Sequence, residues 1–191
     1  MNERTFPPER AHKLDDPARS RWLPPEDVVE KLELTPGMTV ADIGAGTGYF
    51  SIPIARKIEP GRVHAVDLQG QMLETLREKL STDAITNVVV TEGSASATNL
   101  DAELCDLVFL ANVWHELNDH AAVLDEARRI LRSEGRLVIL DWRKSIDPPP
   151  GPPTEHRVSM TETVDMLKAK AWRVERVTLV GKYSYLILAS R

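Results

Sequence analysis

Three glycines that alternate with small residues, Gly44, Gly46 and Gly48, directly follow an apolar run at residues 38–43. Glycine permits a sharp backbone turn, and without a Cβ atom it lets a ligand approach the main chain closely. A loop of this kind between a strand and a helix is typical of a site for a nucleotide-like cofactor. A glycine-rich turn on its own is weak evidence, because many tight turns contain the same residues and bind nothing.

Two carboxylates near this loop narrow the choice of cofactor. Asp42 lies two residues before Gly44. Gly48 comes two positions after Gly46, whereas in the dinucleotide-binding pattern the third glycine comes three positions after the second. A pyrophosphate would be repelled by Asp42, but the cationic amino-acid end of S-adenosylmethionine (SAM) would not. Asp67 ends the next apolar run, where its carboxylate can accept hydrogen bonds from ribose hydroxyls. NAD shares that ribose, so Asp67 indicates a nucleoside cofactor and the loop favours SAM.

The segments around these residues alternate between short apolar runs and helical patterns. Apolar runs separated by helices are typical of parallel strands that are buried on both faces. We expect strands at residues 38–43, 62–68, 87–93, 105–112, 136–142, 173–180 and 182–190. We expect helices at residues 26–34, 49–58, 71–80, 120–131 and 161–171. The order of these elements predicts an α/β protein with a doubly wound sheet.

Turn and capping residues indicate where several of these elements begin and end. Pro25 can occupy the first turn of a helix, and Ser159 and Glu162 have the spacing of a capping box. Gly181 alone separates the last two expected strands. We therefore expect a tight reversal there that makes the two strands antiparallel neighbours.

Two proline-rich segments lie outside the expected sheet. Residues 1–25 are polar and contain two proline pairs, so we interpret them as an N-terminal arm and residues 26–191 as a single domain. Trp22 on this arm either helps a lid to close on the cofactor or only anchors the arm to the helix that follows. The run at residues 147–153 cannot join a central strand, and we expect it to form an exposed loop near the carboxyl ends of the strands.

The residues around the glycine loop resemble a known family. VADIGAGTGYFS at residues 40–51 resembles the first motif of class I SAM-dependent methyltransferases, and HAVDLQGQML at residues 64–73 resembles the segment that follows it. Residues 133–137 resemble the turn into the family's fifth strand, and the similarity extends over about residues 38–189. It is closest to the ubiquinone/menaquinone-biosynthesis-like branch of small-molecule methyltransferases. This resemblance implies a Rossmann-like sheet of seven strands, mostly parallel, with an antiparallel last strand.

The resemblance also implies SAM as cofactor and S-adenosylhomocysteine (SAH) as product. The first motif would hold the methionine part of SAM, and Asp67 would hold the ribose. Ser94 occupies the adenine-binding segment where the family usually has aspartate, and the loop after Asn112 would face the acceptor. The residues expected to contact the cofactor are Asp42, Gly44, Ala45, Gly46, Gly48, Asp67, Leu68, Ser94, Ala95 and Asn112.

Methyl transfer from SAM is an in-line displacement, so much of its acceleration can come from positioning the two reactants. A base is needed only if the acceptor must lose a proton. His115 is the leading candidate for that base, because it should lie at the carboxyl edge and can titrate near neutrality. Glu116 could orient it, and we take both as candidate catalytic residues. The alternative is that His115 packs under the loop and Glu116 caps it or faces solvent.

The histidines do not show the spacing of a metal site. They are His12, His64, His115, His120 and His156. None pairs with another at the i, i+4 spacing that places two ligands on one helix face. We therefore expect no metal, although His12 and His156 lie in segments that could converge with His115. His64 lies within an expected strand, where we expect a packed core residue.

Charge and composition exclude several classes of partner. The formal net charge is −5, with lysines and arginines scattered among acids, so nucleic acid is an unexpected ligand. The longest apolar stretch, residues 107–113, is too short to span a membrane, and the first ten residues lack a signal-peptide core. Cys105 is the single cysteine, which excludes an internal disulfide. We expect a cytoplasmic protein without a membrane partner.

A small organic molecule is the acceptor that these patterns favour. Asn112-Val113-Trp114-His115 lacks the prolines found after the fourth strand in DNA amino-methyltransferases, and one cysteine cannot hold a metalloid as arsenite methyltransferases do. The paired-glutamate loop of protein-arginine methyltransferases is also missing. Two alternatives from other classes remain open at this point, namely an NAD(P)-dependent oxidoreductase and a catalytically idle SAM-binding protein.

Overall fold

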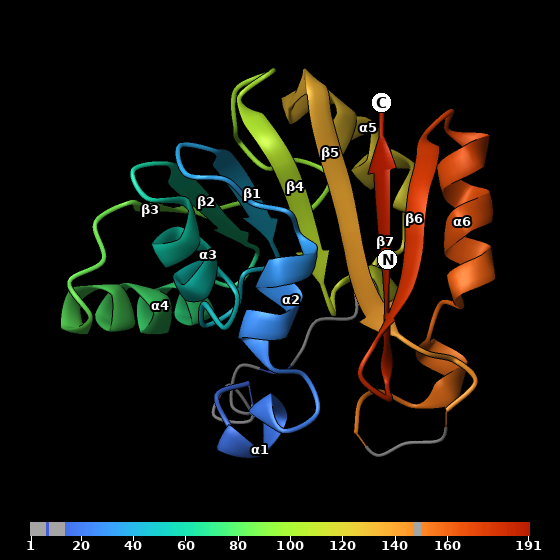
Figure 1. Cartoon of the computed structure of the whole chain (residues 1–191), viewed down its shortest axis with the longest axis horizontal. Helices are drawn as coiled ribbons and strands as arrows, with labels where there is room; N and C mark the ends of the chain where they lie inside the picture. The colour runs from blue at the N-terminus through green and yellow to red at the C-terminus, as the bar shows by residue number, and fades with distance from the viewer. Residues whose placement is uncertain (1–6, 8–13, 147–149) are drawn as a thin grey trace.

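The computed structural model describes residues 7, 14–146 and 150–191, and its centre is a seven-stranded sheet (Figure 1). The strands are β1 (Thr39–Ile43), β2 (Arg62–Asp67), β3 (Val88–Glu92), β4 (Cys105–Ala111), β5 (Leu131–Trp142), β6 (Arg173–Val180) and β7 (Ser184–Ser190). Their order across the sheet is β3-β2-β1-β4-β5-β7-β6. β7 is antiparallel to both of its neighbours, whereas the pairs from β3 to β5 are parallel. The predicted doubly wound, seven-stranded sheet with an antiparallel last strand is confirmed.

The strand order reverses between β1 and β4, which are neighbours at the centre of the sheet. Val40 pairs with Leu107, and Ile43 pairs with Leu110. From β1 the chain proceeds to β2 and β3 on one side, and from β4 it proceeds to β5 on the other. The loops that leave the carboxyl ends of β1 and β4 therefore diverge, and such a crevice is where ligands bind in open α/β sheets.

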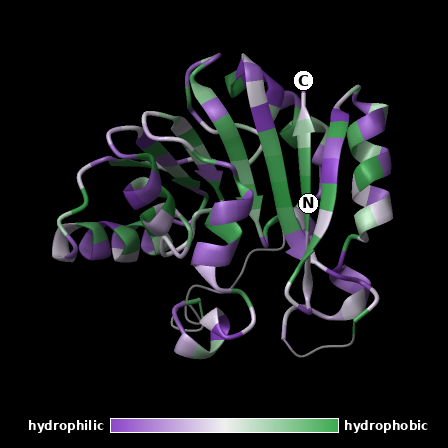
Figure 2. Ribbon diagram, viewed as in Figure 1, coloured by the Kyte–Doolittle hydropathy of each residue, from purple (hydrophilic) through white to green (hydrophobic). Residues whose placement is uncertain are grey.

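The central strands form because their residues are apolar on both faces. In β4, residues 107–111 are all buried, and Figure 2 shows hydrophobic colour along β4, β5 and β7. Strands that are covered by helices on both sides need such uninterrupted apolar runs. β6 lies at the edge of the sheet, and its residues instead alternate between exposed and half-buried positions.

Six α-helices and two 3-10 helices accompany the sheet in the described part of the chain. They are α1 (Pro17–Ser20), α2 (Pro25–Lys31), α3 (Ser51–Ile58), α4 (Gly70–Thr82), η2 (Trp114–Glu116), α5 (His120–Ile130), η3 (Thr154–His156) and α6 (Met160–Ala169). Leu32 and Ile54, at the end of α2 and within α3, belong to the apolar cluster on one face of the sheet. Leu124 of α5 and Leu167 of α6 belong to the cluster on the other face. Burial of these two faces holds the sheet between helices on both sides.

Most of the predicted boundaries agree with the structure. Pro25 begins α2, and Ser159 and Glu162 form the expected capping box of α6. The link between the last two strands was predicted wrongly, because Val180 pairs directly with Ser184. Residues 181–183 all belong to the turn, since one residue cannot reverse two adjacent antiparallel strands.

Two segments meet at the carboxyl edge of the parallel strands. Figure 1 shows α1 below α2, at the same end of the sheet as the arrowheads of β4 and β5 and the segment that follows β5. The predicted N-terminal arm is described only at residue 7 and from residue 14 onward, and His12 lies outside the described residues. Within the described part of the chain, none of the helices is long and apolar enough to cross a membrane.

Candidate active site

A cavity of about 1060 Å³ lies at the carboxyl ends of β1, β2 and β4. Its wall includes ten of the twelve residues predicted from sequence, namely Asp42, Gly44, Ala45, Gly46, Asp67, Leu68, Ala95, Asn112, His115 and Glu116. Gly48 instead faces α4, because a Cβ atom there would lie 2.3 Å from Leu76 Cδ1. Ser94 belongs to a short turn in which its hydroxyl oxygen lies 3.4 Å from that of Ser96. The structure therefore brings together most of the expected site.

The glycine loop turns because its glycines adopt backbone conformations that other residues avoid. Gly44 and Gly46 have φ values of 74° and 54°. A Cβ atom on Gly44 would lie 2.2 Å from Val113 Cγ2, so glycine also permits close packing against the segment after β4. The backbone N–H groups of Gly44 and Ala45 both donate to the carbonyl oxygen of Val66, at 2.7 and 3.0 Å. These bonds tie the loop to the end of β2.

Asp67 holds the loop from the end of β2. Its Oδ2 accepts a hydrogen bond from the backbone N–H of Gly46 at 2.8 Å, and its Oδ1 accepts one from Gln69 at 2.9 Å. Burial raises the pKa of Asp67, although the backbone donors oppose that rise. A carboxylate oxygen has more than one acceptor direction, so both oxygens keep capacity for a ligand hydroxyl.

Asp42 lies beneath the loop and is almost fully buried. Its Oδ2 accepts a hydrogen bond from Ser51 Oγ at 2.5 Å. The pKa of Asp42 is raised to about 6, and burial is the main cause. The hydrogen bond from Ser51 and the charge of Arg19 oppose this rise, whereas the charge of Asp67 adds to it. This carboxyl group therefore changes charge close to neutral pH.

Arg19 of α1 is a cavity residue that the sequence did not single out. Its guanidinium lies 4.0 Å from the centre of the Tyr49 ring and donates to the carbonyl oxygen of Leu14 at 3.0 Å. Burial lowers its pKa to about 10, so it remains a cation at neutral pH. Trp22, the arm residue named from sequence, also lines the cavity, and its ring centre lies 5.2 Å from that of Trp142.

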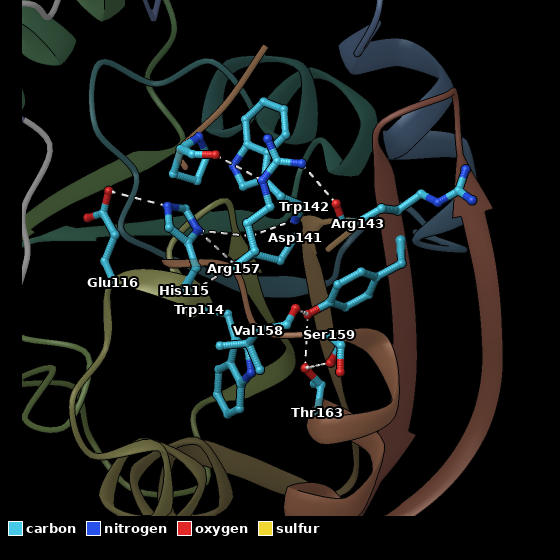
Figure 3. A network of polar contacts seen from close by, with 12 residues as sticks. Trp114, His115, Glu116, Asp141, Trp142, Arg143, Arg157, Val158, Ser159 and Thr163 are labelled. Carbon is cyan, nitrogen blue, oxygen red and sulfur yellow. Dashed lines mark hydrogen bonds and ion pairs between the residues drawn. The ribbon is translucent and has the colours of Figure 1, made fainter. Parts of the chain in front are cut away.

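His115 lies on η2 after β4, next to a buried carboxylate from β5. Pairing of Ala111 with Leu140 brings the carboxyl ends of β4 and β5 together. His115 Nδ1 lies 2.8 Å from Asp141 Oδ1, and the backbone N–H of His115 donates to Asp141 Oδ2 at 2.9 Å. His115 Nε2 lies 3.8 Å from Glu116 Oε1, and Figure 3 shows the ring between the two acids. The expected pair of His115 and Glu116 therefore has a third member, Asp141, which the sequence did not reveal.

The surroundings of His115 favour its charged form. Burial alone would lower the pKa of His115, because it disfavours the imidazolium. The charge and hydrogen bond of Asp141, together with the charge of Glu116, outweigh burial and the opposing charge of Arg157. The pKa of His115 is consequently raised above its ordinary value.

The residues in the cavity fit SAM by their chemistry. Asn112 lines the cavity, and its side-chain oxygen is buried without a hydrogen-bond partner among the described residues. An ammonium group could donate to this oxygen, while the carboxylate of Asp67 could accept from ribose hydroxyls. The volume exceeds what one drug-sized ligand usually needs, which leaves room for a second small molecule.

Comparisons with known proteins identify the family. The family described as "Methyltransferase domain" matches residues 41–139, about half of the chain. A crystal structure of a SAM-dependent methyltransferase from Aquifex aeolicus is 34% identical, with 97% of this chain and 98% of that chain covered and a TM-score of 0.92. The chain belongs to the SAM-dependent methyltransferases. SAM is the cofactor of this family, as the glycine loop and Asp42 indicated.

Curated relatives of this chain match over a shorter range. Demethylmenaquinone methyltransferase of Shouchella clausii is 26% identical over 61% of this chain and 50% of its own length. The ubiquinone/menaquinone biosynthesis C-methyltransferase of Shewanella halifaxensis is 30% identical over 61% of this chain and 47% of its own length. The chain therefore spans about half the length of the curated relatives that it matches.

The other histidines of the chain lie in different surroundings. His156 lines the cavity, whereas the ring of His120 lies tilted against that of Trp114, with 4.3 Å between ring centres. His64 is half-buried on β2, so the packed core position expected for it is only partly realised. Among the described residues, histidine, cysteine and acidic side chains form no group of three that could hold a metal ion.

A buried arginine organises the segment that follows β5. Arg157 is 2% exposed, and its guanidinium lies beside Trp142, with 5.7 Å to the ring centre (Figure 3). It donates hydrogen bonds to the carbonyl oxygens of Arg143, Ile146, Pro150 and Pro152 at 2.8, 2.7, 3.1 and 2.9 Å. Residues 147–149 of the predicted proline-rich loop lie outside the described residues, but residues 150–153 line the cavity. Arg157 thus fixes one wall of the site.

We expect Arg157→Met to lower the free energy of unfolding by about 2–4 kcal/mol, because it leaves several backbone acceptors without their charged donor. Urea unfolding followed by circular dichroism measures this change. Lys144→Met is the matched control, since Lys144 is exposed and a surface substitution should change stability by about 0.5 kcal/mol or less. Equal losses in the two variants would show that Arg157 does not brace the segment.

Proposed function

We propose that this protein transfers the methyl group of SAM to a small organic acceptor bound in the same cavity. The observation that carries this proposal is the placement of the glycine loop, Asp67 and His115 on the wall of one cavity. The first two are the groups that a nucleoside cofactor needs, and His115 lies where an acceptor could contact it. The match to ubiquinone and menaquinone methyltransferases supports an acceptor of small-molecule type.

The binding residues divide between the two ends of the cofactor. We assign the amino-acid end to the loop from Gly44 to Gly46 with Asp42 below it and Asn112 beside it. We assign the ribose to Asp67, which ends the neighbouring strand, with Leu68 next to it. Ala95 and the backbone near Ser94 would then border the adenine.

Bound SAM supplies a methyl group that is made electrophilic by a positively charged sulfur. The chain must then hold the acceptor in line with that methyl group, which is the contribution that positioning makes. Trp22, Trp142 and residues 150–153 enclose the cavity with apolar surface, and a poorly hydrated site suits a reaction in which charge disappears. His115 would accept a proton from an acceptor that must lose one.

We also infer that the N-terminal arm acts as a lid over the cofactor. Asp15 Oδ1 accepts hydrogen bonds from Thr47 Oγ1 at 2.9 Å and from Lys79 Nζ at 2.6 Å. A Cβ atom on Gly46 would lie 3.4 Å from Leu14 Cδ1, so the described part of the arm lies against the glycine loop at this residue. Opening of these contacts would admit the ligand, and their closure would exclude water.

The pKa of Asp42 predicts how SAM binding depends on pH. Burial, opposed by the Ser51 hydrogen bond, raises that pKa to about 6, so Asp42 is mostly protonated at pH 5 and mostly charged at pH 7.5. Only the charged form attracts an ammonium group, so affinity should rise as pH rises through about 6. We expect SAH to bind about tenfold more weakly at pH 5 than at pH 7.5, as the fraction of the competent form dictates.

Calorimetric titrations at both pH values measure this difference, and Asp42→Asn should flatten the pH dependence. A tenfold change that persists in Asp42→Asn would assign the effect to another group.

Two measurements test the proposed function. Calorimetry should show tight binding of SAH and no binding of NAD(H), and Gly44→Val should bind neither, since its Cβ atom would meet Val113. An acceptor screen with isotopically labelled SAM, scored by the mass of the product, should identify a methylated small molecule. Binding of NAD(H) instead of SAH would refute the proposal, and SAH binding without any product would indicate an idle SAM-binding protein.

A further inference from the structure

We propose that Asp141 is a positioning residue that keeps the proton of neutral His115 on Nδ1 and presents Nε2 to the cavity, and that the acceptor is therefore one whose nucleophilic atom carries a proton. Hydroxyl, thiol, N–H and nucleophilic C–H groups belong to this class, whereas thioethers and tertiary amines do not. This inference rests on the proposed methyl transfer and names the class of its acceptor.

The contacts of Asp141 define which ring nitrogen carries the proton. Asp141 is fully buried, and an ionised carboxylate can only accept hydrogen bonds. Its Oδ1 accepts from the backbone N–H of Trp142 at 2.6 Å and lies 2.8 Å from His115 Nδ1, while Oδ2 accepts from the backbone N–H of His115 at 2.9 Å. Nδ1 must therefore be a donor. The same carboxylate contacts both the backbone N–H and the ring of His115, so the ring cannot flip without losing the contact between Nδ1 and Asp141.

Nε2 is then the nitrogen that accepts a proton in the neutral ring. His115 lines the cavity that also contains Asp67 and the glycine loop. The carboxylate of Glu116, 3.8 Å from Nε2, is beyond hydrogen-bond distance but close enough to stabilise the imidazolium once it forms. The charges that act on His115 are those of Asp141, Glu116 and Arg157, and the two acids together raise its pKa against burial and the arginine.

This arrangement is useful only for an acceptor that loses a proton. A buried carboxylate paired with a histidine costs desolvation, and a cavity that served an aprotic nucleophile would gain nothing from it. In the balanced step an electron pair of the acceptor forms the bond to the methyl carbon, the electron pair of the broken carbon–sulfur bond stays on sulfur, and the acceptor proton goes to His115 Nε2.

Nitrogen-15 NMR of the histidine rings tests the positioning role without any acceptor. The His115 signals are assigned by their loss in His115→Gln, and spectra of the unmodified protein are recorded above the pH at which His115 titrates. We expect the proton on Nδ1, and we expect Asp141→Asn to lower the proton affinity of His115 at least about tenfold. A proton on Nε2 in the unmodified protein would overturn the inference, and this result does not require that Asp141→Asn folds.

Kinetics with the acceptor that the screen identifies test the catalytic consequence. Asp141→Asn should lower kcat about 10²-fold or more and shift the pH profile of kcat, while the Kd of SAH stays within about twofold. Asp106→Asn is the matched control, because Asp106 also accepts a backbone N–H, that of Thr39 at 2.7 Å, but lies at the opposite end of β4. We expect it to leave kcat and the pH profile unchanged. Equal kinetics in the two variants would mean that Asp141 only accepts backbone hydrogen bonds and does not position His115.

The position of the transferred methyl group tests the acceptor class. Mass spectrometry should locate it on an oxygen, sulfur, nitrogen or carbon that carried a proton in the substrate. A methyl group on a thioether or a tertiary amine would overturn the acceptor class. Binding of SAH without any methylated product would overturn both the proposed function and the acceptor class, while the NMR result would still decide whether Asp141 positions His115.

Discussion

His115→Ala is expected to lower turnover by about 10²–10⁴-fold, the usual contribution of a positioned general base. Because the pKa of His115 is raised, the neutral ring becomes more abundant as pH rises, and the rate of the unmodified enzyme should increase with pH through that pKa. His115→Ala should lose this dependence, since the substitution removes the ring that accepts the proton. Steady-state rates between pH 5 and 9 with the acceptor from the screen measure both effects.

His64→Ala is the control for this substitution. His64 is a half-buried histidine on β2, away from the cavity wall, so its removal should leave turnover and the pH profile unchanged. SAH should bind to all three proteins with similar affinity, because none of the changes touches the groups assigned to the cofactor. Equal rates for His115→Ala and the unmodified enzyme would mean that His115 only fills space under its loop.

Asp67→Ala is expected to weaken SAM binding by about 1.5–3 kcal/mol, because it removes hydrogen bonds between a charged acceptor and the ribose. Part of the loss will come from the glycine loop, since Asp67 also accepts the Gly46 N–H bond at 2.8 Å. Titration calorimetry with SAH measures the change directly.

Glu92→Ala is the matched control for the ribose assignment. Glu92 ends β3 and pairs with Asp67 across the parallel strands, but it is exposed. Its removal should leave the affinity for SAH unchanged. An affinity that survives Asp67→Ala would refute the ribose role, and an equal loss in both variants would point to a general effect of charge at this edge of the sheet.

The parts of the site that the sequence could predict are those encoded locally. The glycines at 44 and 46 predict a positive-φ turn, and the apolar runs on either side predict the strands that position it. Asp67 was found because it ends such a run, and the ends of neighbouring parallel strands meet. Spacing along the chain and geometry in space coincide for these residues.

The parts that could not be predicted depend on contacts between distant segments. Asp141 appeared only as a polar residue in an apolar run, and its contact with His115 follows from the register of β4 with β5. Arg157 lies in a polar part of the sequence that gives no sign of burial, and its role depends on the path of the loop that it braces. The signal that could have found Asp141 is its place at the carboxyl end of a buried strand, where an acid is costly unless it is paired.

A crystal structure of the protein with SAH tests most directly the claim that this cavity receives the nucleoside. The amino-acid end of the ligand should lie against the loop from Gly44 to Gly46, near Asn112, and both ribose hydroxyls should lie within hydrogen-bond distance of Asp67. Crystals grown with saturating SAH that show no ligand in this cavity, or that take up a pyrophosphate-containing dinucleotide there, would contradict the account.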